Sequence, residues 1–82
     1  MRKYTRDHTV IQDWAQSRGG QPARVRGTAV LRIAFGPPAP HWETLDWPDF
    51  FATFDAERLV FLYEENAGSH ICKLVKGHTV DL

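Results

Sequence analysis

Residues 14–23 read Trp14-Ala15-Gln16-Ser17-Arg18-Gly19-Gly20-Gln21-Pro22-Ala23, and this stretch decides the fold. We expect it to end a helix, to turn on its two glycines and to open a strand. Gly19 suits the left-handed position that commonly follows a helix, and Pro22 prevents the helix from continuing. A phosphate-binding loop would instead open a helix and carry a lysine. The stretch therefore indicates an architecture and no reaction.

Apolar residues at helical spacing predict two amphipathic helices. The first covers residues 7–18, with Asp7 at its N-cap. Its apolar stripe consists of Val10, Ile11, Trp14 and Ala15. The second helix follows Asp46, which we expect at its N-cap, and it carries Pro48 in the first turn, where proline is tolerated. Its apolar stripe consists of Trp47, Phe50, Phe51 and Phe54.

The segment after Pro22 predicts a first hairpin. Apolar and basic residues alternate over residues 23–26. Over residues 31–35 the large apolar residues Leu31, Ile33 and Phe35 alternate with Arg32 and Ala34, and Gly27-Thr28 supplies a turn between the two segments. In this hairpin we expect Arg24, Arg26 and Arg32 to share the outer face. The hairpin would therefore carry a basic surface.

The remaining segments complete one domain. Residues 36–40 contain three prolines, which break regular structure and favour a crossover. A second hairpin joins residues 59–63 to residues 71–76 through a turn at residues 66–68. The expected order αββαββ predicts an α+β fold of two layers, a four-stranded antiparallel sheet covered by two helices. We expect a single domain over residues 1–82, with an ordered core over about residues 5–76 and a tail over residues 77–82.

Composition is typical of a globular protein. Of the 82 residues 43% are hydrophobic and 12% aromatic, which suits a small domain that must bury a dense core. The single cysteine, Cys72, excludes an internal disulfide and a thiolate zinc site. No apolar run reaches the ~18 residues of a membrane span, and no signal-peptide pattern follows Met1. We expect a soluble, cytoplasmic protein.

Candidate catalytic and metal-binding groups are sparse. His70 and Cys72 lie two residues apart on an expected strand and could supply two metal ligands, but no third ligand follows at a typical spacing. No nucleophile motif surrounds Cys72. The carboxylate pair Glu64-Glu65 suits the end of a strand and the turn after it. We therefore expect no enzyme activity, no metal and no cofactor.

Charge is distributed unevenly along the chain, although the formal net charge is zero. Residues 1–40 carry seven basic and two acidic side chains, whereas residues 41–82 carry three basic and eight acidic ones. This asymmetry has two interpretations. The basic half could form a face that binds nucleic acid, or the two halves could neutralise one another across one compact surface. The neutral balance is unusual for a nucleic-acid-binding domain, which is commonly basic overall.

The arginines of the first hairpin and one tryptophan are the candidate contact residues. Arg24, Arg26 and Arg32 would face a protein, a nucleic acid or only solvent. The aromatic residues are expected in the core and not between the arginines, which disfavours base stacking. Trp42 follows the proline-rich segment. It would either anchor a partner, since tryptophan is enriched at interface hot spots, or cap one end of the core.

The chain also resembles a family of bacterial proteins of about this length that have no established activity. The resemblance covers roughly residues 5–76. It rests on Asp7-His8, Ile11, Trp14-Ala15, Arg18 to Ala23, Gly27-Thr28, Leu31-Arg32-Ile33, Phe35-Gly36, Trp47 to Phe51, Phe54-Asp55, Leu59 to Tyr63 and Lys73-Leu74-Val75. Relatives often carry the label 1,4-alpha-glucan branching enzyme. Such enzymes resemble (β/α)₈ barrels, which need ~250 residues, so we reject that activity for this chain.

Together these observations predict a small, non-catalytic protein-protein interaction module that binds a protein partner or a second copy of itself. One alternative is a nucleic-acid-binding accessory protein that uses the same arginines, and its affinity would fall steeply with salt. Another alternative is a small inhibitor or adaptor of the kind that phages and mobile elements encode. No membrane partner is expected.

Overall fold

The computed structural model describes residues 2–77. Within these residues the chain forms six strands and two helices. In chain order they are β1 (Arg2–Thr5), α1 (His8–Gln16), β2 (Gly20–Val25), β3 (Leu31–Phe35), β4 (Trp42–Thr44), α2 (Trp47–Ala56), β5 (Leu59–Glu64) and β6 (Cys72–Lys76). Residues 78–82, most of the expected tail, lie outside the described residues.

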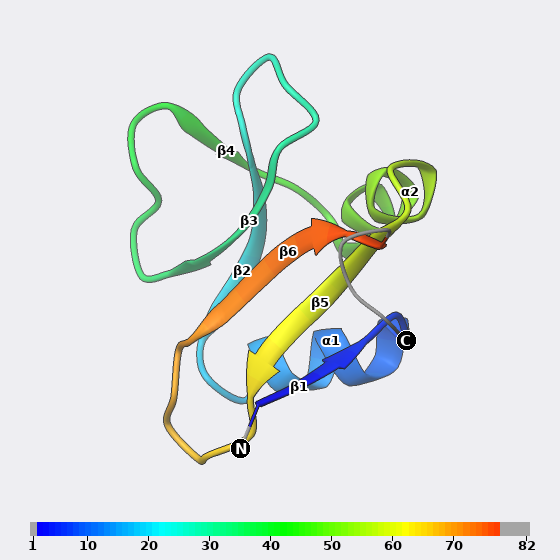
Figure 1. Ribbon diagram of the computed structural model, residues 1–82. Coiled ribbons are helices and arrows are strands. Elements are labelled where there is room, and N and C mark those ends of the chain that lie inside the picture. Colours follow the sequence, from blue (N-terminus) through cyan, green and yellow to red (C-terminus); the bar gives the residue numbers. More distant parts are fainter. Residues whose placement is uncertain (1, 78–82) are drawn as a thin grey trace.

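The strands of residues 2–77 form two antiparallel sheets, ordered β1-β5-β6 and β3-β2-β4 (Figure 1). The expected α+β class is confirmed, but the order αββαββ and the single four-stranded sheet are wrong. β1 adds to β5, with Tyr4 opposite Leu62, and β4 adds to β2, with Trp42 opposite Val25. Each expected hairpin therefore gains a third strand, and the two sheets stay separate.

Neither additional strand has a strong sequence signal. β1 consists mainly of exposed polar residues, as suits the edge of a sheet. β4 has only three residues and follows the proline-rich segment. Backbone hydrogen bonds from the N–H of Arg26 to the C=O of His41, and from the N–H of Leu45 to the C=O of Pro22, hold it against β2. Pro22 has no backbone N–H to donate. This is tolerated because its backbone faces the end of β4, where only its carbonyl is needed, as the acceptor for the N–H of Leu45.

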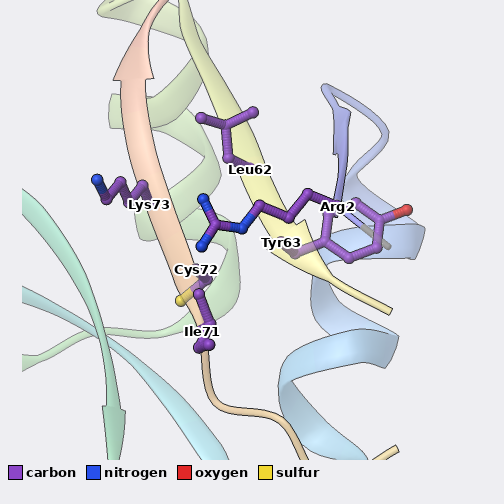
Figure 2. A pocket seen from close by; sticks show the side chains of 6 residues that line it. All are labelled: Arg2, Leu62, Tyr63, Ile71, Cys72 and Lys73. Atoms are coloured by element: carbon purple, nitrogen blue, oxygen red, sulfur yellow. The ribbon is translucent and has the colours of Figure 1, made fainter. Parts of the chain in front are cut away.

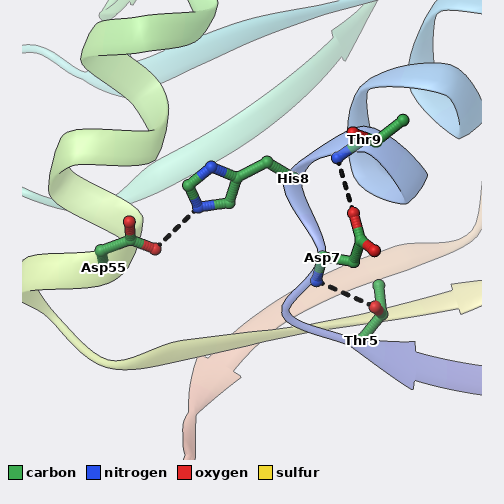
Figure 3. Close-up of polar contacts among 5 residues, drawn as sticks. All are labelled: Thr5, Asp7, His8, Thr9 and Asp55. Carbon is green, nitrogen blue, oxygen red and sulfur yellow. Dashed lines mark hydrogen bonds and ion pairs between the residues drawn. The ribbon is translucent and has the colours of Figure 1, made fainter.

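The start and end of α1 follow the sequence signals. The carboxylate of Asp7 accepts hydrogen bonds from the backbone N–H groups of Thr9, at 2.9 Å (Figure 3), and Val10, at 3.4 Å, which confirms the N-cap. The helix ends at Gln16, two residues earlier than expected. Gly19 has φ +73° and so adopts the expected left-handed conformation.

The second helix follows its expected pattern with one difference. Asp46 occupies the N-cap position of α2, but its side chain makes no capping hydrogen bond. Pro48 lies in the first turn, where no backbone N–H is needed. Phe50, Phe51 and Phe54 are buried, as the apolar stripe predicts. Within the described part of the chain, neither helix has the length and apolarity that crossing a membrane requires.

The core lies between the two helices and the inner faces of both sheets (Figure 1). Its buried members are Ile11, Trp14, Ala15, Leu31, Ile33, Phe50, Phe51, Phe54, Leu59 and Phe61. Trp14 connects the sheets, because its indole packs edge-on against Phe35 of β3, at 5.9 Å between ring centroids, and Phe61 of β5, at 5.4 Å. One side chain of α1 thus contacts both layers of strands.

A histidine joins the two helices at the other end of the core. The ring of His8, the first residue of α1, stacks on Phe51 of α2 with ring centroids 4.1 Å apart. Its Nε2 lies 2.9 Å from Oδ1 of Asp55 on the same helix (Figure 3). The start of α1 is therefore held against α2 by an apolar contact and a polar contact from the same ring.

The edge strands β3 and β6 lie beside one another, and we call the line between them the seam. No backbone hydrogen bond crosses the seam within residues 2–77. Instead, Phe35 at the end of β3 stacks on His70, which precedes β6, with ring centroids 4.3 Å apart. Side-chain packing, and not a continuous ladder, holds the two sheets together.

Candidate functional site

The pairing of β2 with β3 separates two of the candidate arginines. Directly opposite residues of an antiparallel pair share one face of the sheet. Arg24 lies opposite Leu31, a core residue, whereas Arg32 lies opposite Ala23. The face of β2 that holds Arg24 therefore continues on β3 with Leu31, and the face that holds Ala23 continues with Arg32. Arg24 and Arg32 thus occupy opposite faces of the sheet. The expectation that they share the outer face is wrong.

Arg24 is paired within the fold. Its Nε donates to Oε1 of Glu43, which lies directly opposite on β4. Lys3 is paired in a similar way, with its Nζ 3.0 Å from Oε2 of Glu65. Both ion pairs join a base of residues 1–40 to an acid of residues 41–82. They support mutual neutralisation of the two halves of the chain, one of the two explanations for the uneven charge.

Arg32 and Trp42 lie together on the outer face of the β3-β2-β4 sheet. Trp42 lies on β4, opposite Val25, and not on a loop, and the guanidinium carbon of Arg32 is 6.0 Å from the centroid of its indole ring. This distance is the outer limit of a cation–π contact. Arg26 follows β2 and is exposed, with no carboxylate partner within residues 2–77. Of the four candidate residues, the structure therefore brings only Arg32 and Trp42 together.

A groove of about 410 Å³ runs along the seam. Arg32 and Trp42 line it from one sheet, and Lys73 lines it from the other. Lys73 lies opposite Leu62, on the face of its sheet away from the core residue Phe61. The volume lies within the roughly 300–1,000 Å³ of ligand-binding sites, but the lining comes from two sheet edges and forms an elongated surface feature.

The groove continues toward the start of β3. A second hollow of about 230 Å³ shares three lining residues with it, Leu31, Arg32 and Leu74. At the opposite end stands the stacked pair of Phe35 and His70. The two hollows therefore follow β3 from one end to the other.

The groove carries an excess of positive charge. Arg32 and Lys73 line it, and neither has a carboxylate partner within residues 2–77. No acidic residue of this described part lines the groove. The adjoining hollow includes Glu57, whose Oε1 is 3.0 Å from Nζ of Lys76 and is thereby neutralised. The electrostatics favour an anionic ligand.

Cys72 lines the groove, but its thiol is poorly suited to act as a nucleophile. Burial raises the pKa of its thiol to about 11, so the thiol is protonated at neutral pH and is a weak nucleophile. No group of three or more His, Cys, Asp or Glu side chains within residues 2–77 is arranged to hold a metal ion. His70 is instead stacked on Phe35.

A smaller hollow of about 150 Å³ lies on the outer face of the β1-β5-β6 sheet (Figure 2). Arg2 extends from β1 across Leu62 toward β6, where Ile71 and Lys73 complete the lining. The volume is below the size of ordinary small-molecule sites. Half of the Ile71 side chain is exposed, at 54%. This hollow is a weaker candidate than the groove.

Arg18, which follows α1, has a structural role. Its guanidinium carbon is 4.5 Å from the centroid of the Trp14 ring, and its Nη1 donates to the backbone carbonyl of Trp14 at 3.1 Å. Its Nη2 donates to the carbonyls of Glu65, at 3.1 Å, and Asn66, at 3.2 Å. Arg18 therefore fixes the loop after β5 to the end of α1. The sequence contains no local signal for contacts so distant along the chain.

Comparisons with protein-family models, with curated proteins and with solved structures found no match for this chain.

Proposed function

We propose that the protein is a non-catalytic interaction module that binds another protein through the groove along the seam. The single observation that carries the proposal is the position of Arg32 beside Trp42 on the rim of a groove with unbalanced positive charge. Tryptophan and arginine are the side chains most enriched at the energetic centres of protein interfaces. Arg26 does not line the groove, and Arg24 is paired with Glu43 within the fold.

The chemistry of the groove favours binding over catalysis. The thiol of Cys72 is its strongest potential nucleophile, and burial keeps that thiol protonated. His70, the nearest candidate base, is stacked on Phe35. A general base must lie within hydrogen-bond reach of the proton that it removes, and no such contact joins His70 to Cys72 within residues 2–77.

The test is a comparative pull-down from the native host with tagged protein, split into nuclease-treated and untreated samples and analysed by mass spectrometry. We expect a stoichiometric protein partner that survives nuclease and is lost with Arg32→Glu and with Trp42→Ala. Arg26→Glu is the matched control, since it makes the same charge change on an exposed residue away from the groove lining. Circular dichroism must show that all variants remain folded. A partner retained equally by Arg32→Glu and Arg26→Glu would contradict the proposal.

A second candidate function is nucleic-acid binding, which the contact between Arg32 and Trp42 also favours. A cation next to an aromatic ring is the combination that binds a phosphate backbone and a stacked base. The two candidates differ in their dependence on salt. Phosphate contacts release counterions, so the affinity for a nucleic acid would fall steeply as salt rises. Recovery of partners that disappears after nuclease treatment would favour this second candidate.

A further inference from the structure

A basic hollow lies at the end of β6, apart from the groove. It has a volume of about 560 Å³ and is lined by Arg6, Glu57, Arg58, Lys76 and Gly77. Arg6 lies between β1 and α1, Arg58 lies between α2 and β5, and Gly77 follows β6. Three segments that are distant in the sequence therefore converge on the basic hollow. None of its lining residues lines the groove along the seam.

Two guanidinium groups of the basic hollow have no counter-charge. Lys76 is paired with Glu57, at 3.0 Å between Nζ and Oε1. Neither Arg6 nor Arg58 has a carboxylate partner in the described part of the chain. Like charges that line one hollow repel each other, and an anion bound between them would replace this repulsion with attraction. The hollow thus favours an anionic ligand.

The backbone of Arg58 indicates that its side chain has a use at this position. Arg58 follows Glu57, the C-cap of α2, and its φ is +53°. Glycine commonly occupies this position after a helix, because a Cβ is disfavoured in the left-handed conformation. Residues other than glycine that are held in this conformation cluster at active sites and ligand clamps. An arginine at residue 58 therefore costs backbone strain and places a guanidinium at the hollow.

Gly77 leaves room for the guanidinium of Arg6. A Cβ at residue 77 would overlap Nη2 of Arg6 and would lie 3.0 Å from the C=O of Arg58. Gly77 is not among the residues with a positive φ, so its backbone conformation does not itself require glycine. The N–H of Gly77 donates to the C=O of Arg58 at 2.8 Å, which holds the end of β6 beside both arginines. The missing side chain thus allows Arg6 to lie against the end of β6.

We propose that the basic hollow binds the phosphate monoester group of a small phosphorylated molecule, between the guanidinium groups of Arg6 and Arg58. Guanidinium N–H groups match phosphate oxygens in pairs, and two guanidinium charges balance a phosphate dianion. A carboxylate has one charge and would leave one arginine unbalanced. The carboxylates of Asp55 and Glu57 flank the two arginines, so a polyanion such as a nucleic acid would meet repulsion there. This site goes beyond the proposed function, which uses the groove.

The probes are inorganic phosphate and phenyl phosphate, titrated into the ¹⁵N-labelled full chain at constant ionic strength and followed through the backbone amide signals. We expect saturable shifts of the signals of Arg6, Arg58 and Gly77. Arg6→Gln and Arg58→Gly should each weaken binding at least about tenfold. Arg26→Gln is the matched control, since it removes the same charge from an exposed arginine outside the hollow, and its affinity should stay within about twofold. Equal weakening by Arg26→Gln, or no saturable binding at millimolar phosphate, would overturn the proposal.

Two variants separate the loss of binding from the loss of folding. Arg58→Gly should raise the midpoint of thermal unfolding, because glycine adopts a positive φ without strain. Weaker binding in a more stable variant cannot come from misfolding. Gly77→Ala retains both arginine charges and should still weaken binding, because its Cβ displaces the guanidinium of Arg6. Phosphate binding that both variants leave unchanged would contradict the site.

Further probes test the class of ligand. Benzoate should bind at least about tenfold more weakly than phenyl phosphate, because it has one negative charge instead of two. Equal affinities of benzoate and phenyl phosphate would overturn the assignment to phosphate. Tighter binding of a phosphoserine peptide or of an oligothymidine than of phenyl phosphate would assign the hollow to a macromolecule instead. The pull-down with Arg32→Glu and Trp42→Ala tests the groove, so either proposal can fail while the other stands.

Discussion

Trp14 donates its indole N–H to the backbone carbonyl of Glu64, with 2.8 Å between Nε1 and the oxygen. This hydrogen bond joins α1 to the last residue of β5, so the most deeply placed tryptophan also fixes the position of a strand end. An indole N–H that is buried commonly has such a partner. The contact is only partly buried, but it spans fifty positions of the chain.

Replacing Trp14 with phenylalanine should lower the free energy of unfolding. Trp14→Phe keeps an aromatic ring but leaves the carbonyl of Glu64 without its donor, a loss of about 1–3 kcal/mol. The measurement is urea unfolding followed by circular dichroism. Trp47→Phe is the control, because it makes the same size change at a half-buried residue for which no indole hydrogen bond is seen within residues 2–77. Equal losses in both variants would mean that ring size alone matters.

Replacing Gly20 with alanine should destabilise the protein through steric conflict. A Cβ at this position would lie 2.8 Å from Cγ2 of Ile33 and 2.9 Å from Cε1 of Phe35. Overpacking of this kind costs about 1–3 kcal/mol. Gly19→Asn is the control, because Gly19 has open space around it and asparagine tolerates its positive φ. Thermal unfolding should show a lower midpoint for Gly20→Ala than for Gly19→Asn, and the reverse order would contradict the packing argument.

The free energy of unfolding should decrease at high pH because of Cys72. Burial raises the pKa of its thiol from 9.0 to about 11 in the folded chain. The unfolded chain therefore loses this proton first, and stability falls as pH rises through the interval from about 9 to about 11. Alkylation with iodoacetamide should reach half of its maximal rate near pH 11 in the folded protein and near pH 9 in urea. A midpoint near 9 in both states would show that the thiol is not buried in solution.

Lysine should not replace Arg18. The guanidinium donates from two nitrogens to carbonyls of Trp14, Glu65 and Asn66, a geometry that a single ammonium group cannot reproduce. Loss of charged hydrogen bonds costs about 1.5–3 kcal/mol. Arg26→Lys is the matched control at an exposed position, and chemical denaturation should show no change for it. If Arg18→Lys is as stable as Arg26→Lys, the loop after β5 is not held by Arg18.

The sequence predicted the parts of the fold that depend on local signals. Asp7 as an N-cap, Gly19 in the left-handed conformation and the buried stripe of α2 follow from short-range rules. β1 and β4 were not predicted, because an exposed polar edge strand and a three-residue strand after prolines lack an alternating apolar pattern. The division into two sheets also depends on pairing between distant segments, which periodicity does not specify.

The candidate site was predicted only in part for the same reason. Arg32 and Trp42 were singled out, but their proximity arises because β4 joins β2. The sequence carries no signal that Lys73 and His70 belong to the candidate contact surface, since only the approach of β6 to β3 brings them to the groove. Alternation along the sequence predicts Arg24 on the outer face, but the register places it opposite Leu31, because alternation within one strand does not specify which residues of two strands pair.

The separation of the two sheets has a consequence for the order in which the chain can fold during synthesis. All strands of the β3-β2-β4 sheet come from residues 20–44, so this sheet can pair while later residues are still being added. β1 is made first, yet its partner β5 begins only at Leu59. Long-range pairing of this kind slows folding. Among the strands of residues 2–77, the first to be synthesised can therefore pair only after the fifth has been made.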